Sequence, residues 1–220
     1  YIDMSCDSLK TGGSSFAQVL NRVGAEVPVV KDPAYFASVF NVIQDLISDE
    51  RILAGHDISA GGMLTTLLEM CFSNTEGGAA INLSGFDDRD TVKILFSQNP
   101  GIIIQVKDES EIAETLLENG ISYLSIGHPV SERTLFVSNM DEDFSFDINH
   151  YRDKWFMTSY LLDRRQSGKE AALERFNSYK NHGLVFNTGK FDGTFRSAGI
   201  TPDRKKQSWI RAAIIREKGI

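Results

Sequence analysis

The sequence has little cysteine, no long apolar run and no excess of positive charge, and each shortage excludes a class of protein. Two cysteines are too few for a disulfide framework or a zinc site. Apolar runs such as 102–104 are far too short to cross a bilayer, and the first residues show no export pattern. A net charge of −7 argues against nucleic-acid binding. We therefore expect a cytoplasmic protein with no membrane and no nucleic-acid partner.

What remains is the composition of an ordinary globular protein. Its 220 residues are 41% hydrophobic and 24% charged, which is enough apolar surface to build a substantial core without a covalent or metal staple. Cys6 and Cys71 both sit among apolar neighbours, so we expect them to be reduced packing residues.

Hydrophobic periodicity predicts strands alternating with amphipathic helices. The run 101–106 is apolar without interruption, which is typical of a strand buried on both faces of a sheet. We therefore predict an α/β (α+β) fold, a layered mixed sheet flanked by helices. The expected strands are 1–4, 51–55, 79–83, 101–106, 123–126, 134–137 and 144–148, and the expected helices are 15–23, 33–47, 63–71, 90–96, 109–119, 150–165 and 169–180.

The hydrophobic periodicity of the sequence ends at about His182. Up to 181, periodic segments follow one another closely; from 182 to 208 polar residues, glycine and single aromatics alternate without a period, which predicts an extended linker. Residues 209–220 then form an apolar stretch that reads as a strand with no partner of its own. We expect that the chain is part of something longer.

The stretch 55–62, Gly-His-Asp-Ile-Ser-Ala-Gly-Gly, places polar side chains where a strand gives way to a helix. The start of a helix offers unpaired N–H groups and a partial positive charge, and glycine lets a phosphate approach the backbone. Asp57 at the strand end is the kind of ligand that Mg²⁺ takes in nucleotide sites, and the Ser59 hydroxyl can donate to a phosphate oxygen. The pattern favours a magnesium and nucleotide site.

A structural interpretation of the same residues stays open. Asp57 or Ser59 could simply cap the helix, with Gly61 and Gly62 allowing the helix to pack closely on the sheet. A second loop of the same composition, with Gly12, Gly13 and Ser14 ahead of another helix, supports the functional interpretation, although such loops are common. We treat these three residues as further candidates for anion binding.

Other polar groups point to structure. We expect His128, before a proline, to lie in a turn, and Trp155 and Phe156 to belong to the core of a long helix. The acidic clusters 87–90 and 141–143 are interpreted as solvated turns or caps. No serine or cysteine has the neighbours of a catalytic nucleophile, so no catalytic residue is assigned.

The stretch His56-Asp57-Ile58-Ser59-Ala60-Gly61-Gly62-Met63-Leu64, followed by Leu67-Leu68-Glu69-Met70, resembles a segment typical of the phosphoribosylformylglycinamidine synthase family. Further stretches resemble that family in the order of its long, single-chain form, over essentially all 220 residues. They are 9–15, 24–28, 101–106, 126–127, 155–160 and, at the end, 211–219, which resembles the first strand of the glutaminase domain.

This resemblance implies a fold like the C-terminal domain of aminoimidazole ribonucleotide synthetase for residues 1–181, a linker at 182–208 and the first strand of a glutaminase domain at 209–220. It implies an ATP-dependent ligase that uses glutamine to convert formylglycinamide ribonucleotide into formylglycinamidine ribonucleotide in purine biosynthesis. The implied partners are the remaining synthetase and glutaminase domains and these small substrates. The domain alone is expected to be inactive.

By the same resemblance, Asp57 matches a Mg²⁺ ligand of a structural ADP site, Ser59 a nucleotide contact, and His56 lies in the nucleotide-binding motif. The family usually has an acid where this chain has Ala60, so no role is carried over to that position. Two alternatives remain: a piece of another ATP-using synthetase of the superfamily, such as selenophosphate synthetase, and a non-catalytic interaction domain.

Overall fold

The structure, a computed structural model, describes residues 1–178 and, beyond them, residues 187, 189, 192–194, 196, 197 and 199. The chain divides into two compact units, 1–180 and 181–220, and the fold below is that of the first. The predicted strand at 209–220 and most of the predicted linker at 182–208 lie outside the described residues.

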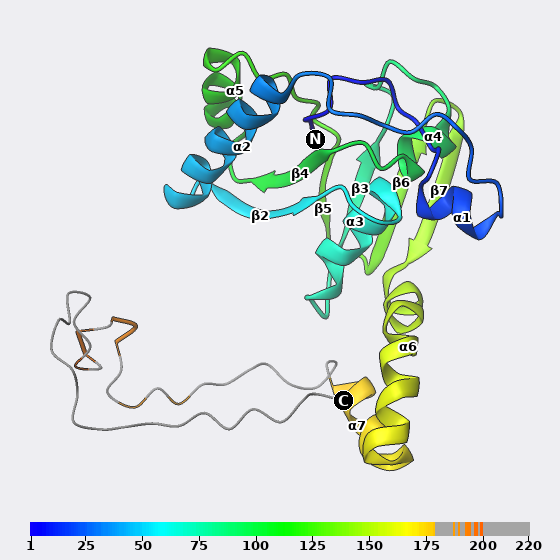
Figure 1. The fold of residues 1–220 in the computed structure, drawn as a ribbon. Helices are drawn as coiled ribbons and strands as arrows, with labels where there is room; N and C mark the ends of the chain where they lie inside the picture. The colour runs from blue at the N-terminus through cyan, green and yellow to red at the C-terminus, as the bar shows by residue number, and fades with distance from the viewer. Residues whose placement is uncertain (179–186, 188, 190–191, 195, 198, 200–220) are drawn as a thin grey trace, which may run out of the picture. The chain divides into compact units, whose positions relative to one another are not determined.

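The first sheet has three antiparallel strands in the order β1–β4–β2 (Figure 1). The side chains of the central strand, β4, pack into two hydrophobic clusters, because successive side chains of a strand point to opposite faces of the sheet. Ile102 and Ile104 pack against one hydrophobic cluster, and Ile103, only 5% exposed, against the other. The apolar run at 101–106 is thus confirmed as a strand with apolar contacts on both faces. The strands are β1 (Ile2–Asp3), β4 (Gly101–Val106) and β2 (Ile52–Asp57).

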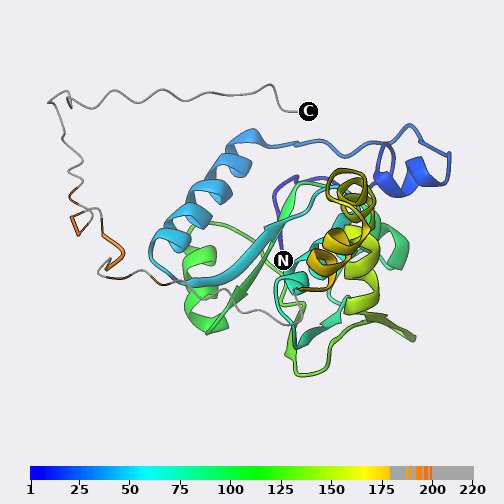
Figure 2. The ribbon, with the colours of Figure 1, turned by 90° about the horizontal axis from the view of Figure 1, so that it is seen from below.

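Helices α2 (Pro33–Ser48) and α5 (Glu109–Glu118) cover one face of this sheet. Asp32 is the N-cap of α2 as predicted. Its carboxylate accepts hydrogen bonds from the backbone N–H groups of Ala34 and Tyr35, and Pro33 occupies the first helical position. Figures 1 and 2 both show the two helices next to one another, away from α6. Their buried side chains are Val39, Val42, Ile43, Leu46, Ile112 and Leu116.

The second sheet has four strands in the order β5–β3–β6–β7. β3 and β6 run parallel, and the outer pairs are antiparallel, so the sheet is mixed. Together with the first sheet and its helices, it confirms the predicted α/β class. The strands are β3 (Gly78–Asn82), β5 (Gly127–Val130), β6 (Thr134–Asn139) and β7 (Glu142–Asp147).

The remaining helices pack on or extend from the second sheet. α3 and α4 contribute the buried Leu67, Leu68 and Ile94 to the core that also holds Leu135 and Val137 of β6. α6 leads directly out of β7, and α7 folds back against it (Figure 1). These helices are α3 (Gly62–Phe72), α4 (Thr91–Phe96), α6 (Ile148–Ser167) and α7 (Lys169–Ser178).

Two predicted elements were misplaced. The helix expected at 15–23 ends early, as α1 (Ser15–Val19), and Val23 is 54% exposed, so the apolar spacing there does not reflect a buried helix face. The strand expected at 123–126 is replaced by β5 at Gly127–Val130, which puts His128 in an edge strand rather than a turn. Leu124 instead exchanges two backbone hydrogen bonds of 2.8 Å with Tyr1, and its side chain packs against the hydrophobic cluster that holds Ile103.

Two packing predictions were wrong as well. Cys71 is half-buried against the α3 core, and burial raises the pKa of its thiol, but Cys6 is exposed. Trp155 is 50% exposed on α6 and is not a core residue. In the described part of the chain, no helix combines the length and the apolar character that a membrane span requires.

Candidate functional site

The junction between β2 and α3 presents its polar side chains to solvent. β2 ends at Asp57 as predicted, and the Asp57 side chain is 76% exposed. Ser59 is exposed as well, and among the described residues its hydroxyl has no hydrogen-bond partner. The carboxylate and the hydroxyl therefore lie two residues apart on the surface, where a ligand can reach both.

The helix at this junction is not capped by either side chain. The N-cap of α3 is Gly61, in the left-handed region at φ 93°, which has no side chain of its own to cap the helix; its N–H donates to the side chain of Gln98. Ser59 takes part only through its carbonyl, which accepts from Gly62 N at 3.0 Å. The interpretation of Asp57 or Ser59 as a simple N-cap is therefore wrong, which leaves both side chains available for another role.

The two glycines are required by close contacts at the start of α3. Gly62 also has a positive φ of 71°, and a Cβ there would lie 2.6 Å from the carbonyl oxygen of Leu95, at the end of α4. A Cβ on Gly61 would lie 2.1 Å from Thr65 Oγ1. The pair does pack closely, but not against the sheet as predicted: Gly62 faces the neighbouring helix α4, and Gly61 faces Thr65 of α3 itself.

Asp57 suits a hard divalent cation as one ligand of several. Carboxylate oxygens are the ligands that Mg²⁺ prefers, and Mg²⁺ in nucleotide sites takes only one or two of them, with phosphate oxygens and water completing its shell. Across the described residues, no three His, Cys, Asp or Glu side chains gather in a way that could hold a metal ion. Among the described residues, Asp57 is the exposed carboxylate at the junction, and other ligands would have to come from the nucleotide or a neighbour.

His56 lies beside Asp57 but turns toward α3. Its Nε2 is 3.0 Å from Oε2 of Glu69, and its Nδ1 is 2.8 Å from the carbonyl oxygen of Asp57. Thr66 Oγ1, in α3, donates to the same carbonyl at 3.1 Å. His56 thus serves the orientation of the junction rather than facing solvent as a free ligand group. Glu69 lies in the stretch 67–70 of the family resemblance, but no role was predicted for it.

The loop with Gly12, Gly13 and Ser14 uses its polar groups internally. Gly12 N donates to the carbonyl of Glu26 at 3.0 Å, and Gly13 N to that of Val23 at 2.7 Å. Ser14 is only 2% exposed; its Oγ donates to the backbone of the loop and accepts from Ala17 N, which makes it the N-cap of α1. Binding of a nucleotide by these three residues stays a prediction, with less support than for Asp57 and Ser59.

Gln98 joins the two glycine-containing regions. Its side-chain oxygen accepts from Ser15 N at 2.8 Å, from Ser15 Oγ at 3.0 Å and from Gly61 N at 2.8 Å, in the amide orientation that its donors require. Stacking of Phe16 on Phe96, with ring centroids 4.6 Å apart, holds α1 against α4 nearby. The starts of α1 and α3 are therefore neighbours in space, although 46 residues separate Ser15 from Gly61 in sequence.

Two hollows lie elsewhere on the surface. A groove of about 780 Å³ runs between the two sheets, with Leu53, Ile103 and His128 among its lining residues. It contains none of the six predicted site residues, and sequence patterns could not reveal it because its walls come from several strands and helices.

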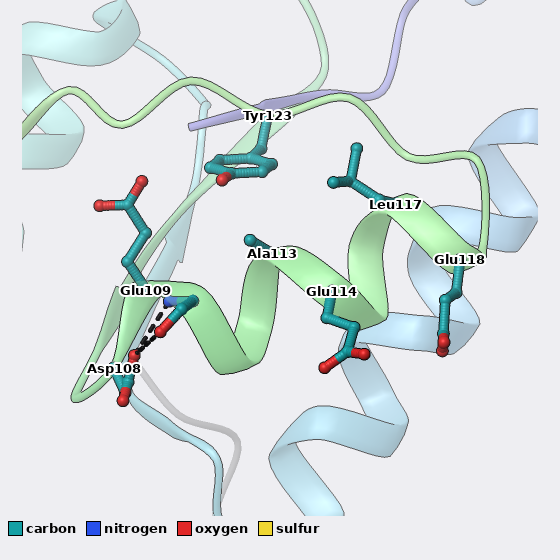
Figure 3. Close-up of a pocket in the computed structure, with 8 residues that line it drawn as sticks. Asp108, Glu109, Ala113, Glu114, Leu117, Glu118 and Tyr123 are labelled. Atoms are coloured by element: carbon teal, nitrogen blue, oxygen red, sulfur yellow. Dashed lines mark hydrogen bonds between the residues drawn. The ribbon is translucent and has the colours of Figure 1, made fainter.

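The second hollow lies over α5 (Figure 3). Four carboxylates, those of Asp108, Glu109, Glu114 and Glu118, line it beside the ring of Tyr123. Hydrogen bonds from Ser110 lower the pKa of Asp108, so this carboxylate stays ionised over a wide pH range. Phosphate groups would be repelled here.

Comparison with known proteins gives these residues a context. Residues 5–138 match the family described as "AIR synthase related protein, C-terminal domain". The match spans more than half of the chain and includes the β2–α3 junction and the Gly12 loop.

Curated relatives match over nearly the whole chain. A probable phosphoribosylformylglycinamidine synthase, chloroplastic/mitochondrial, of Arabidopsis thaliana is 29% identical over 229 residues, covering 100% of this chain and 15% of its own length. The probable enzyme of that name from Caenorhabditis elegans is 27% identical over 99% of this chain, and the one from Dictyostelium discoideum 28% over 100%; each is covered to 18%. The chain therefore spans less than a fifth of these relatives.

Solved structures share the fold. PurLQS from Thermotoga maritima aligns with a TM-score of 0.51 and 14% identity, over 64% of this chain and 24% of that one. PurL of the same organism, complexed with FGAR, aligns with a TM-score of 0.51 and 16% identity, over 64% of this chain and 26% of that one.

Proposed function

The chain belongs to the family of C-terminal domains of AIR synthase related proteins, and we propose that it is the nucleotide-binding part of a phosphoribosylformylglycinamidine synthase. This ligase converts formylglycinamide ribonucleotide, glutamine and ATP into formylglycinamidine ribonucleotide, glutamate, ADP and phosphate. The names of the curated relatives, which match from end to end of the chain, support this assignment. Because the chain covers so little of them, the remaining synthetase domains and a glutaminase are proposed partners.

The observation that carries the proposal is the exposed pair at the β2–α3 junction. Asp57 would hold Mg²⁺, and Ser59 would donate to a phosphate oxygen of ADP or ATP at the start of α3. When bound, Mg²⁺ neutralises phosphate charge. The contribution of this chain is to keep the carboxylate at the surface, 76% exposed, on a rigid strand end.

In this proposal the domain binds and orients the nucleotide but contributes no catalytic side chain. A cytoplasmic location remains a prediction. So does the lack of activity of the isolated domain, which would follow because the other ligands and the ammonia source lie outside it.

The test is calorimetric titration of Mg²⁺-ADP into the intact synthetase. We expect Asp57→Asn to weaken Mg²⁺-ADP binding at least about 100-fold, because an amide oxygen carries no charge to offset that of the cation. Asp49→Asn, at an exposed aspartate that follows α2, is the matched control and should have no effect. Equal affinities of the Asp57→Asn variant and the wild type would rule out the metal site.

A further inference from the structure

Side chains from β2 and α6 meet at Glu69 of α3. From β2, His56 places Nε2 3.0 Å from Glu69 Oε2; from α6, Trp155 donates its indole N–H to Glu69 Oε1 at 2.7 Å. Both carboxylate oxygens are therefore engaged, each by a ring nitrogen whose direction is fixed. Phe72 packs edge-on against the Trp155 ring, with centroids 6.0 Å apart, which restrains the indole further.

The His56 ring in turn lies between Glu69 and Asp57. Its second nitrogen, Nδ1, is 2.8 Å from the carbonyl oxygen of Asp57 and 3.5 Å from Asp57 Oδ1. Side-chain exposure rises along this series, from 20% for Glu69 through 29% for His56 to 76% for Asp57. A half-buried carboxylate is thus connected, through one aromatic ring, to the exposed carboxylate at the strand end.

We propose that Glu69 is a positioning residue for Asp57: held by Trp155, it fixes the His56 ring, and the ring fixes the Asp57 side chain for Mg²⁺. This inference rests on the proposed function of Asp57. It adds two residues, Glu69 and Trp155, and a helix, α6, that none of the comparisons connects with the site.

Two separate contacts hold Asp57, one at its backbone carbonyl and one at its side chain. Thr66 Oγ1 donates to the carbonyl of Asp57 at 3.1 Å and so holds the strand end whether or not His56 is oriented. The contact to Asp57 Oδ1 comes from His56. Loss of Glu69 therefore leaves the backbone of the junction in place and releases mainly the ring beside the carboxylate.

The expected size of the effect follows from the general behaviour of outer-shell groups. A partner that orients a ligand commonly changes metal affinity about 10- to 100-fold when it is removed. In Glu69→Gln, one carboxylate oxygen becomes an NH₂ group, which cannot accept from the ring nitrogen that it faces, Nε2 of His56 or Nε1 of Trp155. In Trp155→Phe, Glu69 keeps its charge and its contact with His56, so the effect should be smaller.

The experiment measures the Mg²⁺ dependence of ADP binding in the intact synthetase by calorimetry, together with the melting temperature. We expect Glu69→Gln to raise the Mg²⁺ concentration needed for half-maximal ADP binding about tenfold, and Trp155→Phe two- to threefold. Saturating Mg²⁺ should restore ADP binding in both variants, because their ligand is present but badly oriented. Glu118→Gln, at an exposed glutamate of α5, is the matched control.

Each outcome decides something different. If Asp57→Asn leaves Mg²⁺-ADP binding unchanged, the proposed function and this inference both fail. If Asp57→Asn weakens binding but Glu69→Gln behaves like Glu118→Gln, only the positioning role is overturned. A lower melting temperature in Glu69→Gln with an unaltered Mg²⁺ requirement would also overturn it, since that result describes a group that only joins α3 to α6.

Discussion

The β2–α3 junction and the loop before α1 have similar sequences but use their polar groups differently. Both place glycines and a serine ahead of a helix. In the loop, the N–H groups of Gly12 and Gly13 bond to backbone carbonyls, and Ser14 caps its own helix while buried. At the junction a glycine occupies the N-cap position, and the side chains of Asp57 and Ser59 remain at the surface.

The difference shows what makes a helix start available to a ligand. Composition supplies the groups, but their availability depends on whether the surrounding chain has already satisfied them. In the loop, residues 23–26 return to supply the acceptors. At the junction, the chain enters α3 through two left-handed glycines, and neither Asp57 nor Ser59 caps the helix, so the carboxylate and the hydroxyl stay exposed, as the proposed nucleotide site requires.

The largest expected effect on stability comes from adding a methyl group at Gly62, and the matching change in the other region is at Gly13. Gly62→Ala should lower the free energy of unfolding by about 3 kcal/mol, because a left-handed φ costs about 1–2 kcal/mol and overpacking against the α4 backbone adds to it. Gly13→Ala has a similar φ of 73°, but its nearest neighbour is a Val27 methyl at 3.3 Å, so we expect about 1 kcal/mol. Urea denaturation measures both; equal losses would show that the α4 contact does not constrain Gly62.

Removing one hydroxyl from each region should separate stability from binding. Ser14→Ala should cost about 1 kcal/mol of stability, as loss of an N-cap does, and weaken Mg²⁺-ADP binding less than Ser59→Ala does. Ser59→Ala should leave stability within about 0.5 kcal/mol and weaken ADP binding about tenfold, since only a ligand uses its hydroxyl. Thermal melting and ADP titration of the two variants test the contrast, and the reverse pattern would contradict it.

The smallest effect is a pH dependence confined to the segment around the Gly12 loop. Asp7 accepts from Lys10 Nζ at 2.6 Å and Lys31 Nζ at 2.7 Å, so it joins the two ends of that segment, and these contacts hold its carboxyl pKa well below the ordinary value. Because the folded pKa is depressed, this stabilisation is present above the unfolded pKa of about 3.9 and is lost as the pH falls through the folded pKa.

Urea denaturation from pH 7 to pH 2 measures how much the ion pairs of Asp7 contribute to the free energy of unfolding. The stability difference between the wild type and Asp7→Asn should be constant from pH 7 to about pH 5 and should shrink below about pH 4. A difference that stays constant down to pH 2 would mean that the two ion pairs do not stabilise the fold.

Patterns that repeat locally were sufficient to predict much of the fold. The start of α2 at Asp32-Pro33, the buried strand at 101–106 and the end of β2 at Asp57 all depend on neighbours within a few residues, and all are confirmed. The predictions for 123–126 and for Trp155 were wrong because distant groups decide them. Leu124 bonds to the backbone of Tyr1, and Trp155 bonds to Glu69, which lies 86 residues away.

The sequence alone determined which groups stand at the end of β2, a histidine, a carboxylate and a hydroxyl before two glycines, because strand and helix boundaries follow from local periodicity and backbone freedom. Only the tertiary structure decided that the carboxylate of Asp57 and the hydroxyl of Ser59 remain exposed, while the backbone N–H groups and the hydroxyl of the Gly12 loop have hydrogen-bond partners within the chain. It also decided that Glu69 contacts His56. Exposure and hydrogen-bond partnership depend on residues that are far apart in the sequence, and packing brings these together.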